Sequence, residues 1–178
     1  MERADKDLAY MLQYENVAWY EAGAVRILDR RVYPAKREFV VCRHHTEVMQ
    51  AIRDMVTQSA GPYTAAPMGM ALAAWECRDL SKTKQLEYLR QAADTIADAR
   101  PTTKTRMVQI TDACMPVAKR ALDEGRPVDL AIRDYVVEAN NIRYNKVAKT
   151  AEYLVDLFPQ NGTIMTQCFA ETIVGMML

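Results

Sequence analysis

A cysteine near the end of the sequence has neighbours that could support proton transfer. Cys168 follows the apolar run 164–166, which predicts a strand, and precedes a segment with helical character. Backbone N–H groups at the start of a helix favour negative charge and can lower the pKa of a thiol there, so that it acts as a nucleophile or as an acid and base. The other interpretation is a small buried side chain without chemistry. That interpretation is the better one for Cys42, Cys77 and Cys114, which lie on apolar faces.

An arginine between two predicted helices could hold a phosphate group. In Arg100-Pro101-Thr102-Thr103, free N–H groups, hydroxyls and a guanidinium could bind the anion together. The same residues would also fit a helix cap beside a solvent-exposed arginine that binds nothing, so both interpretations stay open. The segment 61–69 lacks the glycine patterns of nucleotide-binding loops, and its small residues favour close helix packing.

The histidines and cysteines do not predict a metal site. His44 and His45 are adjacent, and neighbours on a strand or a helix point in different directions. The four cysteines contain no CxxC pair, so we expect reduced thiols rather than a zinc site or a disulfide scaffold. We therefore expect no metal and no organic cofactor.

A small sheet is predicted near the start of the chain. Residues 17–20 and 24–28 predict two strands joined by the turn Glu21-Ala22-Gly23, and Phe39-Val40-Val41-Cys42 predicts a third. Together they form an antiparallel sheet. Before the sheet, the pattern over 5–14 predicts a short helix.

Apolar residues at three- and four-residue spacing predict four helices after the sheet. The first has Thr46 as its cap and ends near Gln58, and the second follows the cap Ser81 and ends before Arg100-Pro101. The third carries Met107 to Leu122, and the fourth runs from about 128 to 158. Residues 60–74 are rich in small side chains that permit close approach of backbones, with an interruption at Pro67.

The last residues predict the beginning of a second domain. The apolar run at 163–166 and a helix over 168–178 would be the first strand and helix of a Rossmann-like α/β domain. The expected organisation is an extension over 1–15, a helical domain with the small sheet over 16–158, and this second domain over 159–178. The fold class is thus mainly α with a small antiparallel N-terminal sheet. Because a parallel sheet needs more than one strand, we expect either a fragment or a chain completed by another.

Composition and charge exclude several classes of protein. The 178 residues are 50% hydrophobic and 26% charged, which is typical of a globular protein and not of a disordered one. Lys and Arg total 23, as do Asp and Glu, so no overall field attracts nucleic acid or an anionic membrane. The charged start is unlike a signal peptide, and no window has the roughly 20 apolar residues of a membrane span. We expect a cytoplasmic protein.

The order of several segments resembles a known family, the methylthioribose-1-phosphate isomerases. The wider family includes ribose-bisphosphate isomerases and the regulatory subunits of the translation-initiation guanine-nucleotide exchange factor. The resemblance is to the N-terminal half and covers nearly all of residues 16–178. The segments that carry it are the strands over 16–41, Ile52-Arg53-Asp54-Met55-Val56, Pro67-Met68-Gly69-Met70-Ala71-Leu72-Ala73, Ala99-Arg100-Pro101-Thr102 and Asn161-Gly162-Thr163-Ile164-Met165-Thr166-Gln167-Cys168.

The resemblance implies roles for individual residues. Cys168 matches a family cysteine that acts in proton transfer, although Gln167 and Phe169 replace the family's histidine and asparagine. Arg100 matches an arginine that binds the substrate phosphate, and Gln58 stands where the family has a second such arginine. Ser59, Thr102 and the backbone near Gly61 would support the phosphate.

The resemblance implies an aldose–ketose isomerase of a 5-substituted ribose 1-phosphate, with Cys168 as one acid and base. The second, a family aspartate, lies beyond these residues, so we expect this chain alone to be inactive. The alternative is a non-catalytic relative that binds a sugar phosphate or a nucleotide, which Gln58, Gln167 and Phe169 favour. A helical interaction module is a third interpretation. The expected partners are a phosphorylated sugar and either a second copy or a chain with the other half.

Overall fold

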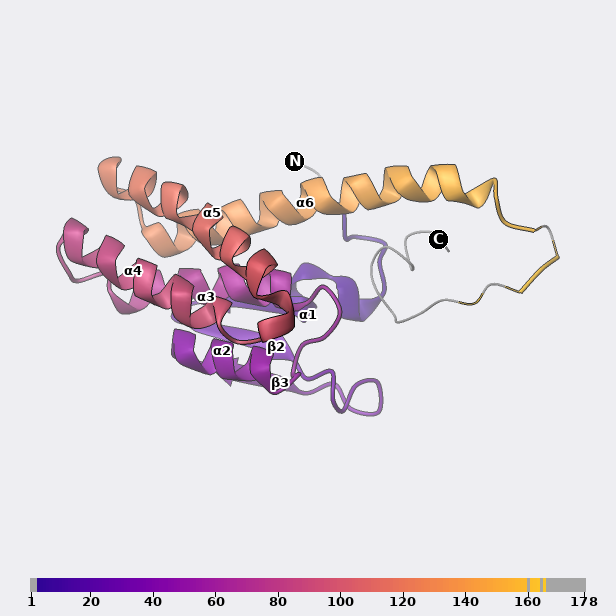
Figure 1. The fold of residues 1–178 in the computed structure, drawn as a ribbon, viewed down its shortest axis with the longest axis horizontal. Coiled ribbons are helices and arrows are strands. Elements are labelled where there is room, and N and C mark those ends of the chain that lie inside the picture. Colours follow the sequence, from indigo (N-terminus) through magenta and orange to yellow (C-terminus); the bar gives the residue numbers. More distant parts are fainter. Residues whose placement is uncertain (1–2, 160, 164, 166–178) are drawn as a thin grey trace.

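The computed structural model describes residues 3–159, 161–163 and 165, and it confirms the predicted antiparallel sheet (Figure 1). Strands β1 (Ala18–Glu21), β2 (Ala24–Leu28) and β3 (Phe39–Cys42) lie in that order. Ala22 and Gly23 connect β1 to β2, both with positive φ, as the favoured two-residue hairpin turns require. A Cβ atom on Gly23 would lie 2.4 Å from the indole nitrogen of Trp75, so glycine also permits close packing there.

The rest of the described chain is mainly helical, as predicted. The long helices are α3 (Pro62–Glu76), α4 (Lys82–Ala97), α5 (Lys104–Asp123) and α6 (Val128–Val155). The shorter elements are the 3₁₀ helices η1 (Tyr10–Leu12) and η2 (Pro101–Thr103) and the helices α1 (Tyr14–Val17) and α2 (His45–Arg53). None of these helices combines the length with the apolar character that crossing a membrane requires.

Helix α3 occupies the centre of the domain and contacts β1, β2, α2, α4, α5 and α6. Every residue from Thr64 to Ala74 is buried, so this helix has no solvent-facing side along most of its length. A Cβ atom on Gly69 would lie 3.0 Å from Val48 and 3.1 Å from Ile96, which confirms the close helix packing expected of these small residues. Pro67, which interrupts the run of small residues in the sequence, lies inside the helix and does not end it.

The predicted end of the first long helix is wrong. The sequence predicted Thr46 as its cap and an end near Gln58, whereas α2 follows His44 and ends at Arg53. Met55 adopts φ 61°, and the Val56 N–H donates to the Ala51 carbonyl oxygen at 3.0 Å. This left-handed residue and six-to-one hydrogen bond are the features of a Schellman ending, here without the usual glycine.

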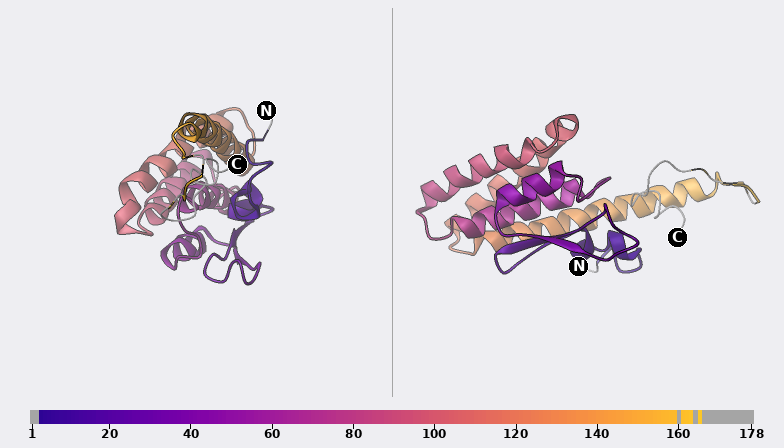
Figure 2. Two further views of the ribbon diagram at one scale, coloured as in Figure 1. Left: turned by 90° about the vertical axis from the view of Figure 1, so that its right-hand side faces the viewer. Right: turned by 90° about the horizontal axis from the view of Figure 1, so that it is seen from below.

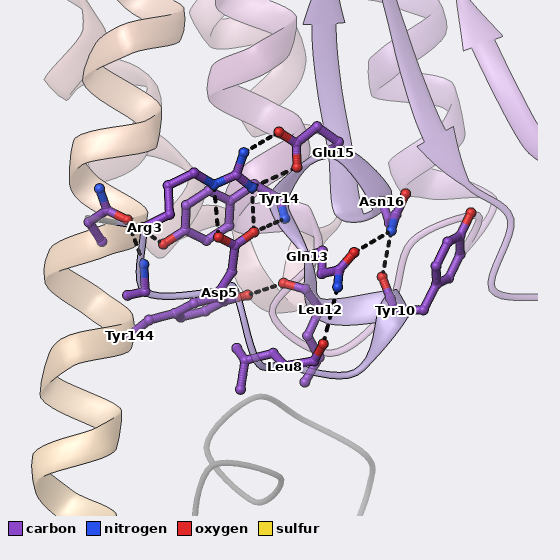
Figure 3. A network of polar contacts seen from close by, with 12 residues as sticks. Arg3, Asp5, Leu8, Tyr10, Leu12, Gln13, Tyr14, Glu15, Asn16 and Tyr144 are labelled. Atoms are coloured by element: carbon purple, nitrogen blue, oxygen red, sulfur yellow. Dashed lines mark hydrogen bonds and ion pairs between the residues drawn. The ribbon is translucent and has the colours of Figure 1, made fainter. Parts of the chain in front are cut away.

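The predicted helix over 5–14 is also wrong, because contacts with distant residues replace helical hydrogen bonds (Figure 3). The carboxylate of Asp5, only 1% exposed, accepts from the Tyr14 N–H at 2.7 Å and pairs with Arg3. The Tyr14 hydroxyl donates to Asn141 on α6 at 2.7 Å, and the Tyr144 hydroxyl donates to the Leu12 carbonyl oxygen at 3.0 Å. These bonds attach the first described residues to α6.

Helix α6 extends beyond the other helices, as both directions of view show (Figures 1 and 2). Its first half packs on α3 and α5. Near its end, Tyr153 is 69% exposed and Val155 is 52% exposed. The predicted α/β segment falls almost entirely outside the described residues.

A half-buried polar cluster joins three helices. Glu76 Oε1 accepts from the His45 backbone N–H at 2.7 Å, and Glu76 Oε2 lies 2.7 Å from His45 Nδ1 and 2.5 Å from the Tyr88 hydroxyl. The carboxylate, at the end of α3, thus accepts a hydrogen bond from a backbone N–H in the first turn of α2. It also accepts one from the Tyr88 hydroxyl on α4. Burial alone raises the pKa of Glu76, but the hydrogen bonds from His45 and Tyr88 outweigh it and hold the pKa below its usual 4.5.

We expect Glu76→Gln to lower the free energy of unfolding by about 2 kcal/mol at pH 7, because charge-assisted hydrogen bonds are lost. A depressed folded-state pKa stabilises the fold above the unfolded pKa, and the stabilisation is lost as pH falls through the folded value. Urea unfolding from pH 7 to pH 3 therefore shows a steeper loss for the unchanged chain than for the variant. Equal slopes would contradict the assignment. Glu87→Gln, on the exposed side of α4, is the matched control.

Candidate functional site

The loop between α2 and α3 brings three of the predicted site residues together. Gln58, Ser59 and Gly61 all line one cleft, with residues from η1, β2 and α6 on its other walls. Ser59 adopts φ 55°, a left-handed conformation that is uncommon for a residue with a side chain. Gln58 Nε2 donates to the Met55 carbonyl oxygen at 3.4 Å, so its side chain closes the loop.

The cleft itself has a volume of only about 10 Å³, which is room for about one water molecule. The backbone donors beside it also have acceptors within the loop. The N–H groups of Gly61, Tyr63, Thr64 and Ala65 donate to the carbonyl oxygens of Gln58, Ala60 and Gly61. Gly61 has ordinary helical angles, and a Cβ atom there would lie 1.9 Å from Thr57 Oγ1. Its glycine therefore permits close packing of the loop.

A much larger space lies on the other side of Ala60. This groove, which we call the α5–α6 groove, has a volume of about 570 Å³, within the range of small-molecule sites. It is bounded by the start of α3 and by facing stripes of α5 and α6. Its lining residues are Ala60, Tyr63, Pro67, Arg106, Gln109, Ile110, Ala113, Tyr135, Val136, Ala139, Asn140, Ile142, Arg143, Lys146 and Val147.

The sequence interpretation did not single out this groove. Arg106, Gln109, Ile110 and Ala113 recur at three- and four-residue spacing, which places them on one side of α5. The stripe combines two polar residues, Arg106 and Gln109, with the apolar Ile110 and Ala113, and the sequence alone shows this combination. No residue pattern, however, shows that this stripe faces α6.

The other predicted phosphate ligands lie at the junction of α4 and α5. Arg100 is half-buried and precedes η2, and its carbonyl oxygen accepts from the Thr103 N–H at 3.2 Å. Thr102 is exposed within η2. Neither residue lines the cleft at Ser59 or the α5–α6 groove. Cys168 lies outside the described residues.

The three cysteines of the described chain are buried and free. Burial raises the pKa of Cys42 and of Cys77 to about 11 and the pKa of Cys114 to about 12. Such thiols are poor nucleophiles at neutral pH. Among the described residues, no group of three His, Cys, Asp or Glu side chains converges as a metal ion would need.

Comparisons with known proteins connect this arrangement to a family. No family model matches the chain. The methylthioribose-1-phosphate isomerase of Roseiflexus sp. (strain RS-1) is 34% identical over 161 residues, which are 85% of this chain and 44% of that protein. The chain matches the amino-terminal half of a methylthioribose-1-phosphate isomerase-like protein. It spans less than half the length of the curated relatives, 43% to 44% of each.

Two solved structures share the fold of this chain. The 5-methylthioribose 1-phosphate isomerase of Pyrococcus horikoshii OT3 superposes with a TM-score of 0.60 at 18% identity, over 86% of this chain and 44% of that one. The delta subunit of translation initiation factor eIF-2B from A. fulgidus gives 0.56 at 23% identity, over 82% and 42%. An enzyme and an initiation-factor subunit thus share the arrangement of sheet and helices, so the fold alone does not choose between them.

We expect Gly61→Ala to lower the free energy of unfolding by about 1–3 kcal/mol, because the added methyl group overlaps Thr57. Adding Thr57→Ala should recover part of the loss, since it removes the oxygen nearest to the new methyl group. Gly125→Ala is the comparison: Gly125 has φ 67° and open space around it, so the substitution costs only backbone strain, about 1 kcal/mol. Urea unfolding measures all four chains. No recovery in the double variant would contradict the packing role of Gly61.

Proposed function

We propose that this chain forms the N-terminal part of an aldose–ketose isomerase that acts on a 5-substituted ribose 1-phosphate, similar to methylthioribose 1-phosphate. The observation that carries the proposal is the match of 85% of the chain to relatives with that activity in their name. The reaction would move a proton between C2 and C1 of the opened sugar, with Cys168 as one acid and base. The second group would come from the part of the relatives that this chain does not span.

Phosphate binding in this proposal begins with Arg100. Its guanidinium can donate charge-assisted hydrogen bonds to phosphate oxygens, and Thr102 can add a hydroxyl. Ser59, Gly61 and Gln58 form the loop that the family uses on the other side of the substrate. Gln58 has a neutral amide where the family has a charged guanidinium, so this loop contributes less to phosphate binding than the same loop with an arginine would.

The proposal also concerns the chain's organisation and partners. Residues 1–15 would be an extension, 16–158 the helical domain, and 159–178 the first strand and helix of a Rossmann-like domain. The sugar-binding site would be complete only in a homodimer or in a complex with a chain that carries the second half.

The test is an isomerisation assay with methylthioribose 1-phosphate. We expect no turnover by this chain alone and turnover after addition of a polypeptide that supplies the remaining half of a relative. In that mixture, Cys168→Ser should lower kcat by about 10²–10⁴-fold, since a positioned acid and base contributes that much. Turnover by this chain alone, or full activity of Cys168→Ser, would contradict the proposed mechanism.

Arg100→Gln in the same mixture should raise KM by about tenfold or more, because a charged phosphate ligand is lost. Arg120→Gln, an exposed position near the end of α5, is the matched control and should leave KM unchanged. No activity in any combination would favour a non-catalytic subunit like that of eIF-2B, for which the replacement of an arginine by Gln58 is the supporting observation.

A further inference from the structure

The α5–α6 groove has a cationic side chain from each of its two long helices. Arg106 projects from α5 and Lys146 comes from α6, and none of the described residues that line the groove is acidic. The Arg106 guanidinium donates to the neutral Oε1 of Gln109 at 3.0 Å, a contact that leaves its charge uncompensated. Two helices thus each bring a cation to one space, with no carboxylate among the described residues that line it. Such an arrangement favours an anionic occupant.

A buried amide in the same groove lacks a hydrogen-bond acceptor. Asn140 is 5% exposed and lines the groove, and its Nδ2 has no hydrogen-bond partner among the described residues. Its neighbour Asn141 is equally buried but accepts hydrogen bonds from the Tyr14 hydroxyl and the Ala4 N–H. Buried amide donors are nearly always paired, so an unpaired one at the wall of a ligand-sized groove indicates an acceptor oxygen supplied from outside the fold.

The groove also has apolar walls that suit an organic group. Tyr63, Tyr135 and Ile110 line it beside the cations. A site with a few polar groups among aromatic and aliphatic side chains is the usual form of a small-molecule pocket. A bare inorganic anion would leave these walls exposed, whereas a phosphorylated sugar would cover them.

We propose that the α5–α6 groove binds a sugar phosphate. Arg106 and Lys146 hold the phosphoryl oxygens, and Asn140 Nδ2 donates to a sugar oxygen. The inference rests on the proposed function for the substrate class, and it places a sugar phosphate at Arg106 and Lys146, in a groove that Arg100 does not line. In this proposal, Arg106 and Lys146 supply positive charge that Gln58 does not.

Isothermal titration calorimetry with ribose 5-phosphate tests the proposal directly on this chain. We expect ribose 5-phosphate to bind and ribose not to bind. The double variant Arg106→Gln/Lys146→Gln should weaken binding by about tenfold or more, because two charge-assisted contacts are lost. The matched control is Lys119→Gln/Arg120→Gln, which removes two exposed charges from α5 outside the groove and should leave the affinity unchanged.

Asn140→Leu separates binding from folding. Removing an unpaired buried donor should leave the midpoint of thermal unfolding equal or higher, while the affinity for ribose 5-phosphate falls severalfold. A residue with only a structural role would lower the unfolding midpoint instead. That outcome would overturn the role of Asn140.

The groove assignment fails if ribose 5-phosphate does not bind, if both double variants bind it equally, or if ribose binds as well as its phosphate. These outcomes are distinct from failure of the isomerase proposal. Binding at Arg106 and Lys146 without turnover in any mixture would reject the isomerase and keep the sugar-phosphate site. Turnover that is insensitive to Arg106→Gln/Lys146→Gln would reject the groove and keep the isomerase.

Discussion

The burial of helix α3 from Thr64 to Ala74 is the constraint on which the rest of the domain depends. A helix with neighbours on every side must carry small residues, because each large side chain would separate its backbone from one of them. Ala65, Ala66, Ala71, Ala73 and Gly69 meet this requirement. The sheet, α2, α4, α5 and α6 can then all contact one helix, and the positions of the loop at Ser59 and of the α5–α6 groove follow from this arrangement.

Regular periodicity made much of the fold predictable. The strands and the helices α4, α5 and α6 have patterns that match the burial of one face, and the structure confirms them to within a few residues. Prediction failed where a contact across the chain decides the local conformation. The Asp5 carboxylate accepts from the Tyr14 N–H, and the Tyr14 hydroxyl donates to Asn141, 127 residues away. No local pattern over 5–14 therefore reveals the turns and the short 3₁₀ helix that these residues form.

The sequence could predict only those parts of the candidate site whose residues are close together in the chain. Gln58, Ser59 and Gly61 share a loop, and the structure places them on one cleft. Arg106 and Lys146 are separated by 40 positions and by two helix boundaries. Their proximity depends on the rotation of α5 and α6 about their axes, which packing on α3 sets. A charged residue on the polar side of one helix does not indicate which other helix that side faces.

Because α6 is anchored along only part of its length, its backbone amides are not equally protected from exchange with solvent. Asn141 and Tyr144 bind the N-terminal segment, and the turns before them pack on α3 and α5, so amides there become accessible to solvent only when the domain opens. The turns that carry Tyr153 and Val155 have exposed side chains and open by fraying alone. We therefore expect amide hydrogen exchange to be faster in these last turns of α6 than around Asn141 and Tyr144.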